Sequence, residues 1–442
     1  MSARIPATYT RRTVFTFATA AAGAIVLASC AGSGDASADG TVTITVMGKA
    51  SELSTDQIAA FEKENPTIKV EFIEYDQSRL SAMLAAGESL EFVSQAPSVN
   101  LFAKGLAEPL DEYLSASEAI SEDDLLPVNG NWQWDGKTTG AGPRYGLVKD
   151  WSPDFTLWYN KALFEQAGVE PLSTTEPVTW DELLETAKAL KAGGVEMPLG
   201  LEWQWSVESK IRTMILQQGG QQFSDDLSEV YFTTPEAKRA FQWFVDYAKA
   251  DVGPTSLNPL ADSSDVGVFT AERMAISLDG YWFGANFASD EHADLHDKLA
   301  MAPAPTFGER LDPSANGGIG AFMPASSQHK DEAWTFFEYF FAGQPAIDRA
   351  GSGWGFPSLQ SLVEYLPADL PFQQQAIETA QAEVPYSEGS PYTPYLAGTQ
   401  INDALNRELQ AVIKGEKSVD AALKTIEDEI NSEIAKGKDQ LG

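Results

Sequence analysis

Tryptophans beside acidic side chains are the clearest chemical feature of this sequence. Asp279-Gly280-Tyr281-Trp282 places an acid just before a turn glycine and a tryptophan two residues after it. Glu202-Trp203-Gln204-Trp205 alternates acid, aromatic, amide and aromatic. Flat rings stack on the apolar C–H faces of a sugar, while carboxylates and amides hydrogen-bond its hydroxyls. In loops at the C-terminal edge of a sheet, such groups would form a sugar-binding cleft.

Each of these pairs also has a structural interpretation. In an extended loop, the side chains of Trp203 and Trp205 would point the same way, as a binding platform requires. The alternative is a strand that buries one face. For Trp282 the alternative is an ordinary core tryptophan. We assign three other tryptophans to the core: Trp132, Trp134 and Trp180.

Further binding candidates lie in loops. Glycines on both sides of Trp354 favour its exposure, and Tyr392 and Tyr395 belong to the loop sequence SPYTPYL. Two charged candidates, Lys49 and Glu52, follow the first predicted strand. The glycine run that contains Gly317 could bring backbone N–H groups close to a ligand.

The sequence carries little evidence of a catalytic or metal-binding site. The sequence contains no G-x-S-x-G elbow, P-loop, H-E-x-x-H or dinucleotide fingerprint. His292 and His296 have helical i,i+4 spacing among acids, which allows a weak surface metal site. A solvated polar helix is the simpler interpretation. We therefore expect no catalytic residue, no resident metal and no cofactor.

The N-terminal segment has the pattern of an export signal. Arg4, Arg11 and Arg12 precede a short apolar stretch that ends in small residues. As a helix, its roughly 15 apolar residues would reach about 22 Å, less than the roughly 30 Å of a bilayer core. Leu27-Ala28-Ser29-Cys30 resembles the bacterial lipobox, which implies cleavage before Cys30 and lipidation of its thiol. Thr10-Arg11-Arg12-Thr13 leaves the Sec and twin-arginine routes both open.

These features predict a signal peptide at 1–29 and a flexible Gly/Ser/Ala-rich tether at 30–40. The mature protein would then be anchored to the outer face of the cell membrane by its N-terminal lipid. The net charge of −34 makes nucleic-acid binding unfavourable, because phosphate contacts need clustered Lys and Arg. An apolar content of 43% allows a full core, and the chain length suggests two lobes.

Alternating hydrophobic patterns predict an α/β fold. Strand patterns at Thr41–Met47 and Ile68–Ile73 flank a helix whose start, Ser54 to Gln57, has capping-box spacing. This β-α-β unit predicts a parallel sheet. A second capping box, Thr179 to Glu182, begins another helix. Further helices are expected at Pro235–Ala250, Lys330–Phe341, Gln374–Ala382 and Val419–Ile434.

Seven segments in order resemble the extracellular solute-binding proteins of bacterial ABC importers, in the sugar-binding branch that includes maltose-binding protein. The most specific are "YNK-x-LF-x-x-AG" followed by "P-x-TWDEL". The segments are QIAAFEKENPTIKVEF, AKGLAEPLDEYL, LWYNKALFEQAGVE, PVTWDELLETAKAL, ERMAISLDGYWFGANF, NGGIGAFMPASSQHKDEAWTFFEYFF and GEKSVDAALKTIEDEIN. One departure is Leu90-Glu91, where the family usually shows Pro-Asp, so the loop Gln95–Ser98 is a weaker site candidate.

The resemblance implies a two-lobed periplasmic-binding-protein-like fold with the ligand between the lobes. Lobe 1 would comprise 41–145 and about 305–345, and lobe 2 would comprise 146–304 and about 346–442. Chain crossings would fall near 144–149, 302–308 and 343–354. Asp150 and Trp151 would then follow the first crossing, within reach of the ligand, and Trp282 occupies the family's stacking position.

The resemblance also implies partners: a small-molecule ligand, most simply a mono- or oligosaccharide, and ABC permease subunits. We expect a monomer that is not an enzyme. Two alternatives stay open on the sequence. The ligand could be a non-sugar solute such as a polyol, an amino compound or a peptide. Less simply, the protein could be a secreted glycoside hydrolase, which needs two carboxyls at a fixed separation across the glycosidic bond.

Overall fold

The computed structural model describes residues 40–261, 264–314, 317–387, 392–396 and 399–441, without the side chains of 204–206 and 441. The predicted signal peptide, Cys30 and the tether as far as residue 39 lie outside the described residues. Within the described part, no helix has the length and apolar content needed to cross a membrane.

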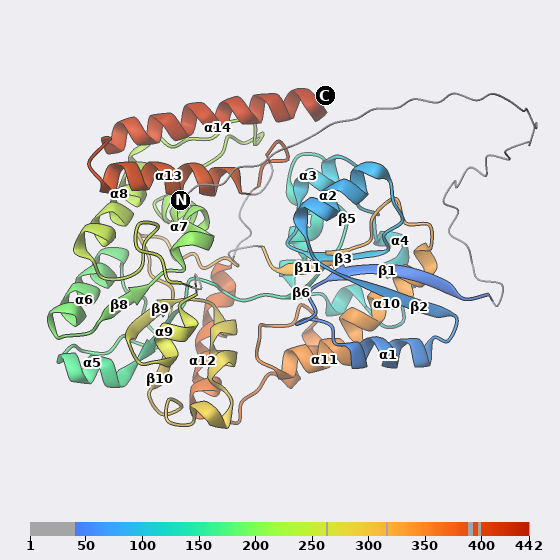
Figure 1. Ribbon diagram of the computed structural model, residues 1–442, viewed down its shortest axis with the longest axis horizontal. Coiled ribbons are helices and arrows are strands. Elements are labelled where there is room, and N and C mark those ends of the chain that lie inside the picture. Colours follow the sequence, from blue (N-terminus) through green and yellow to red (C-terminus); the bar gives the residue numbers. More distant parts are fainter. Residues whose placement is uncertain (1–39, 262–263, 315–316, 388–391, 397–398, 442) are drawn as a thin grey trace, which may run out of the picture. The chain divides into compact units, whose positions relative to one another are not determined.

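A five-stranded sheet organises the first lobe (Figure 1). Strands β1 to β3 run parallel, and β11 is antiparallel to both β3 and β6. Its order is β2 (Ile68–Glu74), β1 (Val42–Gly48), β3 (Phe92–Gln95), β11 (Ile319–Phe322) and β6 (Leu147–Asp150). The predicted β-α-β unit is confirmed: α1 (Thr55–Glu64) begins at Ser54 with the expected capping box.

The alternation of strand side chains divides this lobe between two apolar layers. Val46, Phe92 and Leu147 pack on one side, in a cluster with the phenylalanines of α10 (Lys330–Ala342). Met47 and Val93 face the other side, in a cluster with α2 (Gln77–Ala86) and α3 (Val99–Ala103). With helices on both faces, the sheet is buried and its C-terminal strand ends are left for a site.

A four-stranded sheet organises the second lobe. Its order is β10 (Leu299–Ala302), β7 (Leu157–Asn160), β9 (Met274–Leu278) and β8 (Met197–Gly200). All of its residues except Met197 are buried. The helices packed on it are α5 (Lys161–Ala167), α6 (Trp180–Ala192), α9 (Val266–Thr270) and α12 (Pro371–Glu383). The predicted capping box at Thr179 and Glu182 is confirmed at the start of α6.

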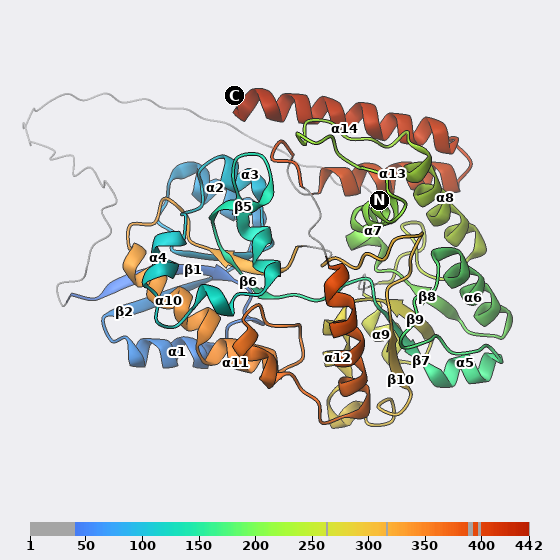
Figure 2. The same cartoon turned by 180° about the vertical axis from the view of Figure 1, so that it is seen from behind.

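Four further helices form a layer on this lobe (Figure 2). They are α7 (Trp203–Gln217), α8 (Pro235–Ala250), α13 (Gln400–Ile413) and α14 (Val419–Leu441). The four-residue spacing of Ala422, Ile426 and Ile430 places them on one buried face of α14, as predicted. The remaining elements include α4 (Asp111–Ala116), α11 (Gln344–Gly351) and a small sheet of β4 (Gln133–Trp134) and β5 (Thr139–Arg144).

The first and third chain crossings lie later than the sequence predicts. Strand β6 belongs to the five-stranded sheet, so the first crossing is 151–156 rather than 144–149. The second lies between β10 and β11, within 303–318, which overlaps the expected position near 302–308. Ala346, Ala350 and Leu362 still pack in the first lobe's cluster, so the third crossing follows Leu362. At the first and third crossings, apolar residues near the expected boundary extend the packing of the first lobe.

Candidate ligand-binding site

A cavity of about 270 Å³ lies where segments from both sheets converge, and we call it the central pocket. Its walls come from the segment after β1, the end of β6, the first crossing, α7, the end of β9 and the loops around Trp282 and Trp354. The lining residues are Lys49, Glu52, Lys149, Asp150, Trp151, Ser152, Asp154, Glu202, Lys210, Leu278, Asp279, Trp282, Ser314, Ile319 and Trp354.

On the lobe 1 side, the buried charges are balanced. The Lys149 ammonium forms an ion pair with Asp150 and lies 3.5 Å from Glu52 Oε1. Arg349 Nε lies 4.0 Å from Asp150 Oδ2, and Ser94 donates a 2.9 Å hydrogen bond to Glu52 Oε2. Burial lowers the pKa of Arg349, and the two carboxylates oppose that shift. Since a buried charge is tolerated only when paired, this wall is held in one arrangement.

On the lobe 2 side, carboxyl groups crowd together around a serine and a lysine. The Ser277 hydroxyl lies 2.5 Å from Asp279 Oδ2 and 2.9 Å from Asp265 Oδ2. The Glu202 N–H donates to Asp265 Oδ2 at 3.3 Å. Burial, together with the neighbouring carboxylates, raises the pKa of Glu202 to about 7 and that of Asp279 well above its usual range. Burial lowers the pKa of Lys210, and the same carboxylates counteract this.

The loop that carries Trp282 approaches the first crossing closely. A Cβ at Gly280 would lie 2.1 Å from Asp154 Oδ1 and 2.3 Å from the Ser152 hydroxyl, so the position requires glycine. Trp158 Nε1 donates a 2.9 Å hydrogen bond to the Gly280 carbonyl. The Trp282 ring is thereby held at the pocket, 5.7 Å from the Trp354 ring at 51°.

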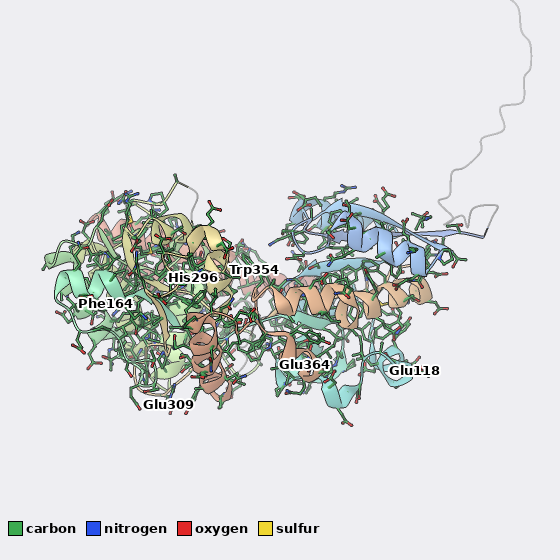
Figure 3. All side chains as sticks on the ribbon, turned by 90° about the horizontal axis from the view of Figure 1, so that it is seen from below. Glu118, Phe164, His296, Glu309, Trp354 and Glu364 are labelled. Atoms are coloured by element: carbon green, nitrogen blue, oxygen red, sulfur yellow. The ribbon has the colours of Figure 1, made fainter. Side chains whose placement is uncertain are left out.

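The two indoles differ in exposure. Trp282 packs partly against the core, whereas 45% of Trp354 is exposed. Trp354 is labelled in Figure 3. Trp354 is positioned by the strand-like pairing of Phe356 with Trp151, whose indole N–H donates to the Pro357 carbonyl at 3.1 Å. The pocket thus has an aromatic side and, next to it, a carboxyl-rich side.

The central pocket brings together most of the candidates proposed from the sequence: Lys49, Glu52, Asp150, Trp151, Asp279, Trp282 and Trp354. The sequence candidates omit Glu202, Asp154 and Lys210. Glu202 was visible only as part of the acid–aromatic motif, and Asp154 ends the turn-like Ser152-Pro153-Asp154. A single lysine between the apolar residues Val207 and Ile211 was the signal for Lys210.

The expectation of an extended segment at residues 202–205 is wrong. Glu202 has a left-handed backbone (φ 43°), and α7 begins at Trp203. The Trp203 ring packs 4.9 Å from that of Phe244, and its N–H donates to Asn406 Oδ1 at 2.9 Å. The buried residues Trp203, Val207, Ile211 and Ile215 have the four-residue spacing that favours a helix. The side chain of Trp205 lies outside the described residues.

Three other candidates lie away from the central pocket. The Gly317 N–H donates to the Ser314 carbonyl at 3.0 Å. The ring of Tyr395 lies 5.9 Å from the Lys438 ammonium, against α14. The Tyr392 hydroxyl accepts a 3.1 Å hydrogen bond from Arg212. Tyr392 lines a cavity of about 180 Å³ with Ala96–Asn100, part of which is the weaker candidate loop Gln95–Ser98.

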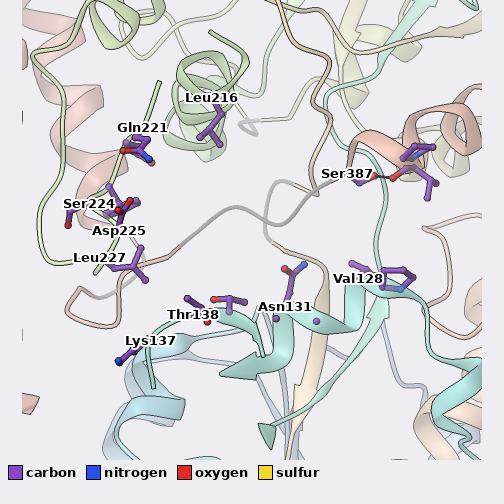
Figure 4. A pocket seen from close by; sticks show the side chains of 18 residues that line it. Val128, Asn131, Lys137, Thr138, Leu216, Gln221, Ser224, Asp225, Leu227 and Ser387 are labelled. Atoms are coloured by element: carbon purple, nitrogen blue, oxygen red, sulfur yellow. Dashed lines mark hydrogen bonds between the residues drawn. The ribbon is translucent and has the colours of Figure 1, made fainter. Parts of the chain in front are cut away.

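A second cavity, of about 650 Å³, is larger than the central pocket and is lined by other residues (Figure 4). Its walls come from the 127–140 and 216–227 segments and from residues 384–387. Among its described lining residues, Lys137 and Asp225 carry charges and none is a tryptophan. The described lining therefore does not place a tryptophan beside a carboxyl group, as the sequence suggested for the binding site.

The two candidate metal-binding histidines do not form a site. His292 ends a short 3-10 turn, Asp290–His292, and His296 Nε2 lies 2.8 Å from the Phe287 carbonyl. Among the described residues, no group of three or more His, Cys, Asp or Glu side chains could hold a metal ion.

Comparison with known proteins identifies the family. Residues 47–342 match the family model for bacterial extracellular solute-binding proteins, and the chain belongs to this family. An uncharacterised ABC transporter extracellular-binding protein of Pyrococcus horikoshii is 29% identical over 218 residues. The match spans 46% of this chain and 48% of that relative, so the chain covers about half the length of the curated relative it matches.

Solved structures share the fold over nearly their whole length. A Listeria monocytogenes ABC substrate-binding protein in complex with cycloalternan has a TM-score of 0.73 at 22% identity, covering 89% of this chain and 99% of its own. A Thermotoga lettingae solute-binding protein bound with α-D-tagatose has a TM-score of 0.70 at 24% identity, with the same coverage. At these identities, the likeness establishes the two-lobed periplasmic-binding-protein fold.

Proposed function

We propose that this protein is the binding component of an ABC importer and captures a carbohydrate in the central pocket. The observation that carries the proposal is the pair of indoles, Trp282 and Trp354, beside buried carboxyl groups. The rings would stack on the C–H faces of a sugar, and the carboxyls would bind its hydroxyls. Relatives with this fold bind cycloalternan and α-D-tagatose, which supports the carbohydrate class.

The pocket's construction suits capture and release. Lys49 and Asp150 come from lobe 1, and Asp279 and Trp282 come from lobe 2, so a ligand that touches both sides favours closure of the lobes. The closed form would be the one that ABC permease subunits recognise. We further propose that the mature protein is a monomer held at the membrane surface by a lipid on Cys30.

Isothermal titration calorimetry against mono- and oligosaccharides tests the proposal. Trp354→Ala should weaken binding of the best sugar by about tenfold or more, since stacking and buried apolar area are both lost. Tyr365→Ala is the matched control, because Tyr365 is similarly exposed (42%) but does not line the pocket. The absence of heat with any saccharide, or equal losses in both variants, would contradict carbohydrate capture. A reducing-end assay with sugar polymers excludes hydrolysis if no product forms.

A further inference from the structure

The two sides of the central pocket differ in charge. On the lobe 1 side, Glu52 and Asp150 are matched by Lys149 and Arg349. On the lobe 2 side, Lys210 interacts with a group of carboxyls from the first crossing, the N-cap of α7, the residue before α9 and the residue after β9. These are Asp154, Glu202, Asp265 and Asp279. Lys210 itself is only 4% exposed. The lobe 2 side thus has several acids for one buried cation.

Hydrogen-bond geometry at Ser277 favours an extra proton in this acid cluster. Ser277 has one hydroxyl hydrogen, yet its oxygen lies within hydrogen-bond distance of both Asp265 and Asp279. Both contacts are hydrogen bonds only if one carboxyl is protonated. Asp265 Oδ2 already accepts the Glu202 N–H, so the proton belongs on Asp279, whose pKa is raised by burial. The carboxyls crowded around Lys210 on the lobe 2 side therefore favour a retained proton.

The aromatic side, independently of the acids, favours a ligand in this space. The ring of Trp354 is 45% exposed and lies 5.7 Å from that of Trp282, in the same cavity as Asp279 and Glu202. Indole faces also attract cations through the ring quadrupole. A cationic group on the ligand would therefore be favoured both by the rings and by the carboxyls.

We propose that the central pocket selects a carbohydrate that carries a protonated amine, that is, an amino sugar with a free amino group. This inference rests on the proposed function and narrows its ligand class. Glu202 and Asp279 bind the ammonium, and the rings bind the sugar face. The bound cation favours ionised carboxylates, so binding releases protons from the cluster to solvent. A neutral sugar would leave these protons in place.

Matched pairs of sugars test the charge preference directly. The probes are glucosamine with glucose, galactosamine with galactose, and chitosan oligosaccharides with their N-acetylated counterparts. At about pH 6, where an ordinary amine is cationic, at least one amine form should bind at least about tenfold more tightly than its neutral partner. Calorimetry in two buffers of different ionisation enthalpy should show net proton release for the amine form and none for the neutral form.

Variants assign the preference to the acid cluster. Asp279→Asn and Glu202→Gln should each weaken binding of the amine form by about tenfold or more, and by a larger factor than they weaken binding of the neutral form. Two variants are needed because Asp279→Asn disturbs a buried hydrogen bond and could fail to fold. Asp428→Asn, an exposed acid on α14, is the control with the same charge change and no expected effect.

Each outcome separates this inference from the proposed function. If neutral sugars bind as tightly as every amine partner, the amine preference is overturned and carbohydrate capture stands. The amine forms could bind more tightly than the neutral forms and yet lose as much affinity in Asp428→Asn as in the two cluster variants. In that case the acid cluster is not the determinant and the inference fails. If simple diamines bind as tightly as the amino sugars, carbohydrate capture is contradicted instead. Binding of no probe at all overturns both.

Discussion

At the residue scale, the central pocket contains carboxyl groups whose pKa values are raised above their usual range. Glu202 combines a left-handed backbone with partial burial close to Asp265. The Ser277 hydroxyl contacts both Asp279 and Asp265. Ionised carboxyl groups in these positions lower the stability of the folded protein, because like charges and burial both disfavour ionisation. Such a cost is expected at a binding site, where a ligand can remove it.

Glu202→Gln tests this cost through the pH dependence of stability. The folded-state pKa of about 7 lies above the ordinary 4.5, so the folded protein binds the proton more tightly than the unfolded chain. Stability contributed by Glu202 is therefore present at acid pH and is lost as pH rises from about 4.5 to about 7, by up to about 3 kcal/mol. Thermal unfolding from acid to neutral pH should show a smaller decline for Glu202→Gln than for the wild type. Parallel profiles would contradict the assignment.

At the element scale, regular elements could be predicted and their connections could not. Capping boxes at Ser54 and Thr179 and the alternation in β1 depend on local sequence, and they predicted these elements correctly. The start of α7 depends on a left-handed turn at Glu202 and on packing of Trp203 against α8, which local patterns do not encode. The first crossing was placed too early for a related reason, since strand β6 is specified by its pairing with β11.

The candidate site follows the same division. Trp282 and Trp354 were recognisable from local sequence, because Trp282 follows an acid and a turn glycine and Trp354 has glycines on both sides. Lys210 and Asp265 were not recognisable, because their roles depend on α7, α9 and β9 meeting at one place. Residue type can therefore indicate the kind of ligand, whereas the charge balance of the pocket requires the fold.

Gly280→Ala tests how the loop after β9 positions Trp282. The added Cβ would meet the short side chains of Asp154 and Ser152, which cannot move aside without leaving the pocket. We expect a loss of about 1–3 kcal/mol in the free energy of unfolding and weaker ligand binding. Gly351→Ala is the control: its Cβ meets nothing closer than 3.7 Å at the end of α11. Denaturant unfolding and calorimetry provide the two readouts, and equal effects of both variants would contradict the steric argument.

At the scale of the whole molecule, the two sheets are linked by three crossings, and the first of these contributes directly to the pocket. Trp151, Ser152 and Asp154 lie in the crossing 151–156 and also line the cavity. Ser152 and Ser314, from the first and second crossings, both donate hydrogen bonds to Asp154. Under the proposed function, a ligand bound there would contact the segments that bend when the lobes close. Binding and closure would then be coupled through shared residues.

Cys30→Ala tests whether the folded part is held at the membrane by its N-terminus. The lipobox-like Leu27–Cys30 predicts a diacylated cysteine, and two acyl chains anchor far more stably than one. The pocket residues begin at Lys49, beyond the predicted tether, so calorimetry should give an unchanged ligand affinity. Cell fractionation should find the variant released or unprocessed, whereas Ser29→Ala, which keeps a small residue before the cysteine, should remain anchored. A Cys30→Ala protein that stayed membrane-bound and correctly processed would show that another segment provides the attachment.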